Sequence, residues 1–238
     1  MTELSDLRVK IFADGADRAG IARLAQNPLI KGVTTNPTLM RAAGVVEYES
    51  FARELVGLLP DKPISFEVLS DDFDEMERQA LKIAAWSDNV YVKIPVTNCR
   101  QESSLGLIQR LVDRGVQLNI TAIMTVEQVE MVAKGLSGAE RGYVSVFAGR
   151  IADTGRYPVP VIRAALDVLA DHPALELIWA SPREILNLFE ADAAGCHVIT
   201  LTHDLLRKLS LVGKDLEEFS LETVRMFFND AEAARLSL

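Results

Sequence analysis

Lys93 occupies a position where a charge is costly. It lies inside the run Val-Tyr-Val-Lys-Ile-Pro-Val over residues 90–96, which predicts a buried strand that ends in a turn. Burying an ammonium group without partners costs several kcal/mol. A lysine that gives up its proton in such a place is a nucleophile for carbonyl carbons, the reaction that forms a Schiff base. The alternative is a lysine at a strand end whose amine reaches water.

Polar side chains close most of the other apolar runs of the chain as well. They comprise two carboxylic acids, several amides and hydroxyls, and two arginines: Asp14, Thr34, Thr35, Asn36, Glu67, Asn119, Thr121, Ser145, Arg150, Ser181 and Arg183. Two acids and a lysine that converge on one place suit proton transfer around an imine, and arginines suit an anionic group. The set predicts a class I aldolase type of site.

Each of these residues also has a structural interpretation. Asp14 is a common residue type for a turn or a helix cap, and Asn36 followed by proline is typical of a turn. An arginine most often faces solvent. Thr121 and Ser145 are small enough to be core residues bonded to the backbone. A carboxylate inside an apolar strand, as at Glu67, is costly without partners, which favours a functional role.

Eight apolar runs alternate with stretches of helical period and must position these side chains. The runs are 9–14, 32–36, 63–68, 89–96, 118–123, 143–147, 175–181 and 197–202. Segments such as 49–59 and 158–170 carry apolar residues three and four apart, as amphipathic helices do. Strands that are apolar on both faces and linked by helices predict a parallel sheet covered on both sides.

Eight such units in 238 residues predict one domain over 1–238, a closed (β/α)8 (TIM) barrel, which typically takes about 250 residues. The active site of this fold lies at the carboxyl ends of the strands. An open doubly wound sheet is the alternative, but neither GxGxxG nor GxxxxGK[ST] occurs. Residues 216–238 predict a C-terminal helix whose apolar side chains pack on the barrel or on a neighbouring subunit. A homo-oligomer is a further expectation, because barrel enzymes often associate through their outer helices.

The composition is that of a globular protein, with 49% hydrophobic and 25% charged residues. A net charge of −9 argues against nucleic-acid or anionic-membrane partners. No apolar stretch approaches about 18 residues and the first residues lack a signal-peptide pattern, so the expected compartment is the cytoplasm. Two cysteines and three histidines, without ligand spacing, predict free thiols and no metal.

Five segments, in chain order, resemble the transaldolase family. They contain Thr34-Thr35-Asn36-Pro37, Lys93-Ile94-Pro95-Val96-Thr97, Asn119-Ile120-Thr121, Ser145-Val146-Phe147-Ala148-Gly149-Arg150 and Ser181-Pro182-Arg183. The resemblance implies that Lys93 forms an imine with a ketose while Glu67, Thr121 and Asp14 handle protons and water. It implies no cofactor. The substrates that it implies are sugar phosphates.

The resemblance also implies the substrate-binding residues. Those expected to hold the sugar are Asn36, Thr35, Asn119, Ser145 and Phe147, and those expected to hold its phosphate are Arg150, Ser181 and Arg183. Asn36 and Asn119 hold the hydroxyls of the three-carbon unit in this interpretation. The implied reaction moves a dihydroxyacetone unit from a ketose phosphate, such as fructose 6-phosphate, to an aldose such as erythrose 4-phosphate.

Three alternatives to this reaction stay open. Related fructose-6-phosphate aldolases usually carry glutamine and tyrosine at the positions of Glu67 and Phe147, so these residues favour a transaldolase over an aldolase. A transaldolase acting on a modified sugar is the second alternative. It is suggested by Gly15, where the family commonly has threonine, and by the longer polar loop 98–104, whose Arg100 is expected to face solvent. The third is a non-catalytic sugar-phosphate-binding barrel.

Overall fold

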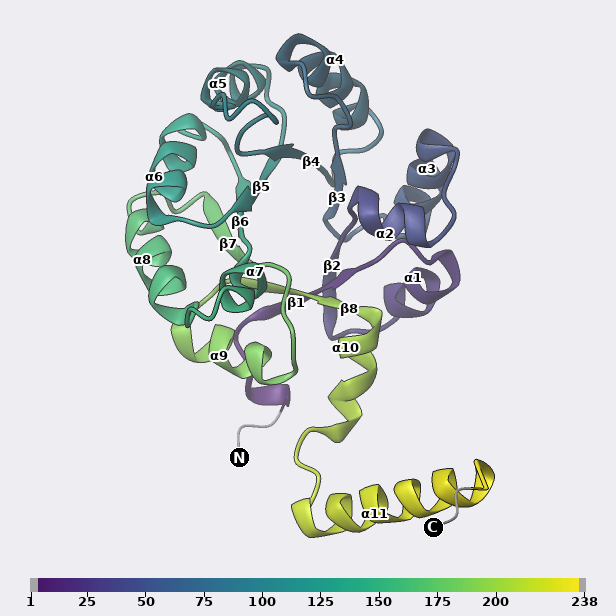
Figure 1. Cartoon of the computed structure of the whole chain (residues 1–238). Helices are drawn as coiled ribbons and strands as arrows, with labels where there is room; N and C mark the ends of the chain where they lie inside the picture. Colours follow the sequence, from purple (N-terminus) through teal and green to yellow (C-terminus); the bar gives the residue numbers. More distant parts are fainter. Residues whose placement is uncertain (1–3, 236–238) are drawn as a thin grey trace.

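Eight parallel strands close into a barrel in the computed structural model, which describes residues 4–235 (Figure 1). The strands are β1 (Lys10–Asp14), β2 (Ile30–Thr34), β3 (Ile64–Glu67), β4 (Val90–Pro95), β5 (Leu118–Ile123), β6 (Gly142–Val146), β7 (Leu175–Trp179) and β8 (Val198–Thr202). Each strand pairs with the next, and β8 pairs with β1. The predicted (β/α)8 barrel is confirmed, and the open-sheet alternative is wrong.

Helices alternate with the strands along the chain, and most of them surround the barrel as an outer ring (Figure 1). In order they are η1 (Leu4–Asp6), α1 (Arg18–Ala25), α2 (Pro37–Ala42), α3 (Tyr48–Leu58), α4 (Phe73–Ala84), α5 (Leu105–Asp113), α6 (Val126–Gly135), α7 (Ala148–Asp153), α8 (Val159–Leu169), α9 (Leu186–Ala194), α10 (His203–Arg207), η2 (Lys208–Leu211) and α11 (Leu216–Ala233). The predicted helices 49–59 and 158–170 correspond to α3 and α8. Their apolar stripes face the strands because that burial removes them from water.

The strand limits differ from the prediction by up to two residues, and the second strand shows why. The second strand was expected over 32–36, but β2 ends at Thr34. Asn36 instead caps α2, because its Oδ1 accepts a hydrogen bond from the Leu39 N–H at 2.9 Å. Pro37 follows at the first helical position, where its missing N–H is not needed. The turn between β2 and α2 is therefore fixed by the same residues that the motif contains.

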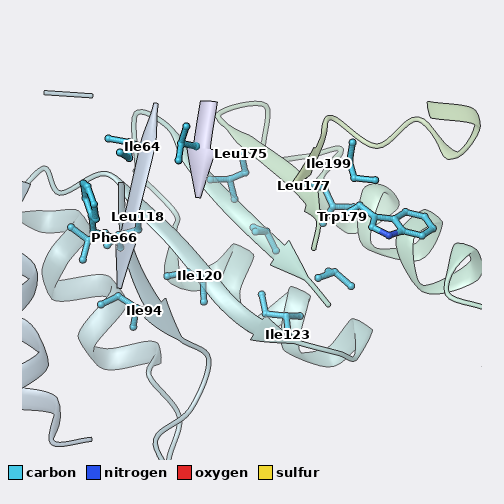
Figure 2. Close-up of a cluster of buried hydrophobic side chains, with 14 of the residues drawn as sticks. Ile64, Phe66, Ile94, Leu118, Ile120, Ile123, Leu175, Leu177, Trp179 and Ile199 are labelled. Atoms are coloured by element: carbon cyan, nitrogen blue, oxygen red, sulfur yellow. The ribbon is translucent and has the colours of Figure 1, made fainter. Parts of the chain in front are cut away.

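Two apolar layers hold the barrel together. The larger one lies between the strands and the helices, and Figure 2 shows part of it, including Phe66, Ile94, Ile120 and Trp179. The smaller layer fills the barrel interior and is built from Phe12, Tyr91, Tyr143, Ile178, Ala180 and Val198. The Phe12 and Tyr143 rings meet edge to face at 5.6 Å. Gly32 leaves room for Phe12, since a Cβ there would come within 2.6 Å of its ring.

The interior layer determines where polar residues lie. Side chains alternate between the two faces of a strand, so a residue two positions after an interior one also points inward. Asp14 follows Phe12, Lys93 follows Tyr91, and Ser145 follows the interior ring of β6. The amino-terminal half of the barrel interior is thus aromatic and apolar. Its carboxyl-terminal half carries the polar side chains.

The last helix, α11, lies apart from the barrel (Figure 1). None of its residues is buried, and Phe227 and Phe228 are 63% and 64% exposed. The C-terminal helix was predicted, and its existence is confirmed over Leu216–Ala233. The predicted last residues, 236–238, lie outside the described part of the chain. Among residues 4–235, no helix combines the length and the apolar character needed to cross a membrane.

Candidate active site

A cavity of about 530 Å³ opens at the carboxyl ends of the strands. Ten of the twelve predicted site residues line it: Asp14, Asn36, Glu67, Lys93, Thr121, Ser145, Phe147, Arg150, Ser181 and Arg183. Thr35 and Asn119 do not. The wall also includes threonines at 34, 38, 200 and 202. A cavity of this size with several converging polar groups is typical of a small-molecule site.

Lys93 lies in this cavity with its amine enclosed. The residue is 6% exposed, and its Nζ donates to the Thr35 carbonyl at 2.8 Å and lies 3.0 Å from Glu67 Oε2. The pairing of β3 with β4 places Glu67 beside Lys93. Glu67 is in turn held through its carbonyl, which accepts a 2.8 Å hydrogen bond from the Tyr48 hydroxyl. The buried amine therefore has both an opposite charge and a neutral acceptor, as a buried charge requires.

Asp14 is the second carboxylate of the site and has a different environment. Its Oδ1 accepts from Thr34 Oγ1 at 2.9 Å, and its Oδ2 accepts from Asn36 Nδ2 at 3.4 Å. Burial raises the pKa of Asp14 because desolvation disfavours the charged form. The positive charge of Lys93 and the two hydrogen bonds partly oppose this rise. A carboxyl group that holds a proton more readily than usual suits a general base that must also return the proton.

Thr121 presents an unsatisfied hydroxyl. The residue is buried at 2% exposure, lines the cavity, and its Oγ1 has no hydrogen-bond partner within the described residues. A buried hydroxyl without a partner costs about 1–3 kcal/mol, so such a group is normally satisfied by a ligand or a water. Thr121 lies beside Pro95, two residues beyond Lys93 on the neighbouring strand β4, and lines the same cavity as the lysine, which suits contact with a molecule bound there.

Asn119 lies below the cavity instead of in its wall. It is fully buried, its Nδ2 donates to Ser65 Oγ at 3.0 Å, and its Oδ1 accepts from Ser145 Oγ at 2.7 Å. Thr35 is also fully buried, and its hydroxyl donates to the Ser65 carbonyl at 2.8 Å. Its contribution to the site is the main-chain carbonyl that accepts from Lys93. Both residues position the site from beneath in this structure.

The arginines lie on the far side of the cavity from β3 and β4. Arg150 belongs to α7, and its guanidinium carbon lies 6.0 Å from the centre of the Phe147 ring. Arg183 donates from Nη1 to Ser181 Oγ at 3.0 Å and from Nε to Asp153 Oδ1 at 2.8 Å. A second bond joins Arg183 Nη2 to the same carboxylate. Both residues are exposed and line the cavity, and the guanidinium of Arg183 already holds one anion, the Asp153 carboxylate.

Gly149 allows these two segments to meet. A Cβ at this position would lie 1.5 Å from the Ser181 carbonyl oxygen, so no other residue fits without moving the loop. Ser181 itself has a φ of 60°, an uncommon value for a residue other than glycine. This close approach brings Ser181 and Arg183 beside the helix that carries Arg150. The close contact with the Ser181 backbone therefore explains why the 145–150 segment has a glycine at position 149.

The structure shows what surrounds the two positions at which the sequence departs from the family pattern, Gly15 and the loop 98–104. At Gly15, a Cβ would come within 2.8 Å of His203 Nε2, so this imidazole occupies the space that a side chain would need. Burial lowers the pKa of His203. In the loop after β4, Arg100 is exposed and paired with Asp71 at 3.5 Å and Glu102 at 3.1 Å. This arginine is not part of the cavity wall.

The site contains no set of ligands for a metal. Within residues 4–235, no group of three or more histidine, cysteine, aspartate or glutamate side chains is arranged to hold an ion. Cys99 is exposed and Cys196 is buried, and neither forms a disulfide.

A model of the family described as "Transaldolase/Fructose-6-phosphate aldolase" matches residues 11–238 of this chain. The chain belongs to this transaldolase/fructose-6-phosphate aldolase family. A "Probable transaldolase 2" of Listeria monocytogenes is 37% identical over 215 residues, which are 89% of this chain and 94% of that protein. A "Probable transaldolase" of Dehalococcoides mccartyi is 33% identical and covers 84% and 90%. The predicted family, and an enzyme of the transaldolase/aldolase type, are confirmed.

Solved structures of lower identity share the fold of this transaldolase-family chain. A 2,3-dimethylmalate lyase superposes with a TM-score of 0.53 at 14% identity, covering 98% of this chain and 86% of its own. A second structure, "Native KDPGal structure", gives a TM-score of 0.51 at 17% identity, covering 99% and 100%. At these identities the likeness concerns the barrel and not its chemistry.

Three side chains of the site were missed in the sequence-based set. Ser65 bonds Asn119, Thr200 contacts Thr34, and Thr202 lines the cavity. Thr34 was recognised as a strand-end residue, but its neighbour Thr35 was predicted to bind the substrate. The alternation of side chains along a strand would have identified these residues, because every second side chain points into the barrel. Thr34 shares the inward face with Gly32, and Thr200 and Thr202 share it with Val198.

Proposed function

We propose that the protein is a transaldolase that transfers a dihydroxyacetone unit from a ketose phosphate to an aldose through an imine on Lys93. The observation that carries the proposal is the position of the amine. Lys93 Nζ lies enclosed in the cavity, 3.0 Å from a carboxylate that can accept its proton. A lysine activated in this way attacks a ketone carbon. Fructose 6-phosphate and erythrose 4-phosphate are the donor and acceptor proposed.

The first stage forms the imine. Glu67 takes a proton from the Lys93 ammonium, and the free amine adds to the C2 carbonyl of the ketose to give a carbinolamine. That intermediate loses its hydroxyl as water, with the proton for the leaving oxygen supplied from Glu67 and with Thr121 Oγ1 as a partner for the departing water. The support for these roles is that Glu67 contacts the amine and that Thr121, which lines the same cavity, has a hydroxyl without a partner in the described residues.

The second stage breaks the bond between C3 and C4. Asp14 removes the proton of the C4 hydroxyl, the C4 oxygen becomes an aldehyde, and the electron pair of the C3–C4 bond moves to the imine nitrogen to leave an enamine. The acceptor aldehyde then adds to the enamine, and Asp14 returns the proton to its oxygen. Hydrolysis of the new imine releases the product ketose. The raised pKa of Asp14 supports a group that both takes and returns a proton.

The phosphate group lies at the arginine side of the cavity in this proposal. Arg150, Arg183 and Ser181 offer donors that suit phosphate oxygens. Asn36 and Ser145 line the same cavity as Lys93 and these arginines and are proposed to hold sugar hydroxyls. Asn119 and Thr35 are proposed to act by positioning Ser145 and Lys93, since neither is in the cavity wall.

Product analysis with and without an acceptor tests the reaction. With fructose 6-phosphate alone, a transaldolase releases at most one glyceraldehyde 3-phosphate per active site and no free dihydroxyacetone. With erythrose 4-phosphate added, turnover becomes continuous and a seven-carbon ketose phosphate accumulates. Free dihydroxyacetone without an acceptor would instead identify an aldolase. A response only to a substituted ketose would identify the modified-sugar alternative, and binding without turnover in any case would identify a non-catalytic barrel.

We also propose that the protein is a homo-oligomer in which α11 packs against another copy. The support is the apolar character of a helix without buried residues, on which Val224, Phe227 and Phe228 are 59% to 64% exposed. Large exposed apolar surface of this kind is typical of an interface. Sedimentation velocity of the full chain and of a Phe227→Ser/Phe228→Ser variant tests it. A monomer in the unchanged protein would contradict the proposal.

A further inference from the structure

Two threonine hydroxyls connect Asp14 to both neighbouring strands of the barrel. Thr34 Oγ1 on β2 donates to Asp14 Oδ1 at 2.9 Å and lies 2.6 Å from Thr200 Oγ1 on β8. Between the two hydroxyls, either atom is able to be the donor. Both threonines are buried, at 4% and 5% exposure, and both line the cavity. Thr200 has no role in the reaction described above.

The direction of these hydrogen bonds depends on the proton of Asp14. A hydroxyl has one hydrogen to donate and two lone pairs that accept. When Asp14 is ionised, Thr34 donates to it, and Thr200 donates to Thr34. When Asp14 holds a proton on Oδ1, the acid donates to Thr34, whose hydrogen rotates toward Thr200, and the Thr200 hydrogen turns toward the cavity. Two hydrogen bonds therefore join Asp14, Thr34 and Thr200 in both states, and each threonine hydrogen stays on its own oxygen.

We infer that Thr34 and Thr200 form a reversible hydroxyl relay that positions Asp14 and stabilises it both with and without its proton. The inference rests on the proposed function, in which Asp14 takes a proton from one substrate and returns it to the next. Both threonines are positioning residues, because they act through the carboxyl group. If Asp14 had hydrogen-bond partners in only one protonation state, either the removal of the proton from the donor or its return to the acceptor would be disfavoured.

The other neighbours of Asp14 do not serve both states. Asn36 Nδ2 only donates, at 3.4 Å, and its Oδ1 is occupied by the Leu39 N–H. The charged groups facing the carboxyl are Lys93 on β4 and Glu67 on β3, and they act on Asp14 by charge. A lysine ammonium has no lone pair to accept a hydrogen bond from the protonated acid. Among the hydrogen-bond partners of Asp14 in the described residues, Thr34 alone is able to reverse.

The test is the titration of the Asp14 carboxyl carbon by ¹³C NMR in the full-length protein without substrate, assigned with an Asp14→Asn variant. Thr34→Val removes both a donor to the carboxylate and an acceptor for the acid. Because the bond to the charged carboxylate is the stronger of the two, the titration midpoint is expected to rise by about one pH unit. Thr200→Val leaves the reversed Thr34 hydrogen without an acceptor, so it disfavours the protonated state. It is expected to lower the midpoint by about half a unit, the opposite sign.

Two further variants separate the relay from simple packing. Thr200→Ser keeps the hydroxyl and is expected to restore the midpoint of the unchanged protein to within about 0.2 units. Thr34→Val/Thr200→Val is expected to match Thr34→Val alone, because Thr200 acts only through Thr34. A Thr200→Val midpoint that is unshifted or raised, or an effect that adds fully to that of Thr34→Val, would overturn the relay.

Activity distinguishes this failure from failure of the proposed function. The titration needs no substrate, so the predicted midpoints with no dihydroxyacetone transfer would refute the proposed function and retain the relay. Normal transfer with unshifted midpoints would refute the relay alone. If both hold, Thr200→Val also slows aldehyde release in a single turnover by up to about threefold, the rate equivalent of half a pH unit in the midpoint of Asp14, while Thr200→Ser does not.

Discussion

The pair formed by Lys93 and Glu67 leads to a prediction with a defined magnitude. Two unit charges 3.0 Å apart attract by about 5 kcal/mol at an effective dielectric constant of about 20. Much of this attraction offsets the cost of removing both groups from water, so the intact pair adds little net stability. Removing one partner is different, because it leaves the other charge buried and unpaired, at a cost of about 3–5 kcal/mol.

Lys93→Met is therefore expected to lower the free energy of unfolding by about 3 kcal/mol, the lower end of that range, because Glu67 is 19% exposed. For a chain of this length the loss corresponds to roughly 6–12 °C in Tm. Glu67→Gln is expected to cost about 2 kcal/mol. The Lys93→Met/Glu67→Gln protein contains neither charge, and we expect it to be about 2 kcal/mol more stable than Lys93→Met alone.

Urea unfolding followed by circular dichroism measures all four proteins. The double variant still lacks the hydrogen bond from Lys93 to the Thr35 carbonyl, so full recovery is not expected. The matched control is Arg53→Met with Glu49→Gln, an exposed pair on α3 in which Glu49 also pairs with Lys82, and its cycle is expected to give a much smaller coupling than that of the buried pair. A double variant no more stable than Lys93→Met would refute the argument that these two charges are held in place by each other.

Three further predictions follow from individual side chains. Because the pKa of Asp14 is raised in the folded protein, its contribution to stability is present below its ordinary value of 3.8 and is lost as pH rises through the raised value. Asp14→Asn is thus expected to be inactive but about 1 kcal/mol more stable at pH 7, with the gain gone at pH 3, as measured by unfolding at both pH values. Phe147→Tyr adds a hydroxyl to the cavity wall and is expected to release free dihydroxyacetone from fructose 6-phosphate; no release would show that this position does not set aldolase activity. Arg183→Met is expected to lower kcat/KM for a phosphorylated aldehyde by about 10- to 100-fold, while kcat/KM for the unphosphorylated aldehyde stays unchanged. Equal losses of kcat/KM with the two aldehydes would mean that the phosphate binds elsewhere.

The barrel could be predicted because its signals are local. Eight apolar runs separated by amphipathic stretches leave few architectures, and the missing phosphate-loop motifs removed the open sheet. The ends of individual strands were predicted less accurately. The second strand ended two residues early because Asn36 caps α2, a competition between strand and cap that the run of apolar residues does not reveal.

The sequence predicted which strand ends form the candidate site, but it did not always predict which residue at a strand end points into the cavity. Thr34 and Thr35 are identical in type, and only the inward register set by Gly32 and Phe12 decides that the first faces the cavity. Asn119 lies one layer deeper than expected, because its amide is used by two serines. The substrate pair, the cytoplasmic compartment and the oligomer stay predictions.

Borohydride reduction in the presence of fructose 6-phosphate, followed by peptide mass spectrometry, tests the central proposal most directly. Reduction of the trapped imine or enamine-derived iminium is expected to add a three-carbon unit to Lys93. Addition of erythrose 4-phosphate before reduction is expected to deplete that adduct, and Lys93→Met is expected to lack it. An adduct on another lysine, or an adduct that survives in Lys93→Met, would contradict the account.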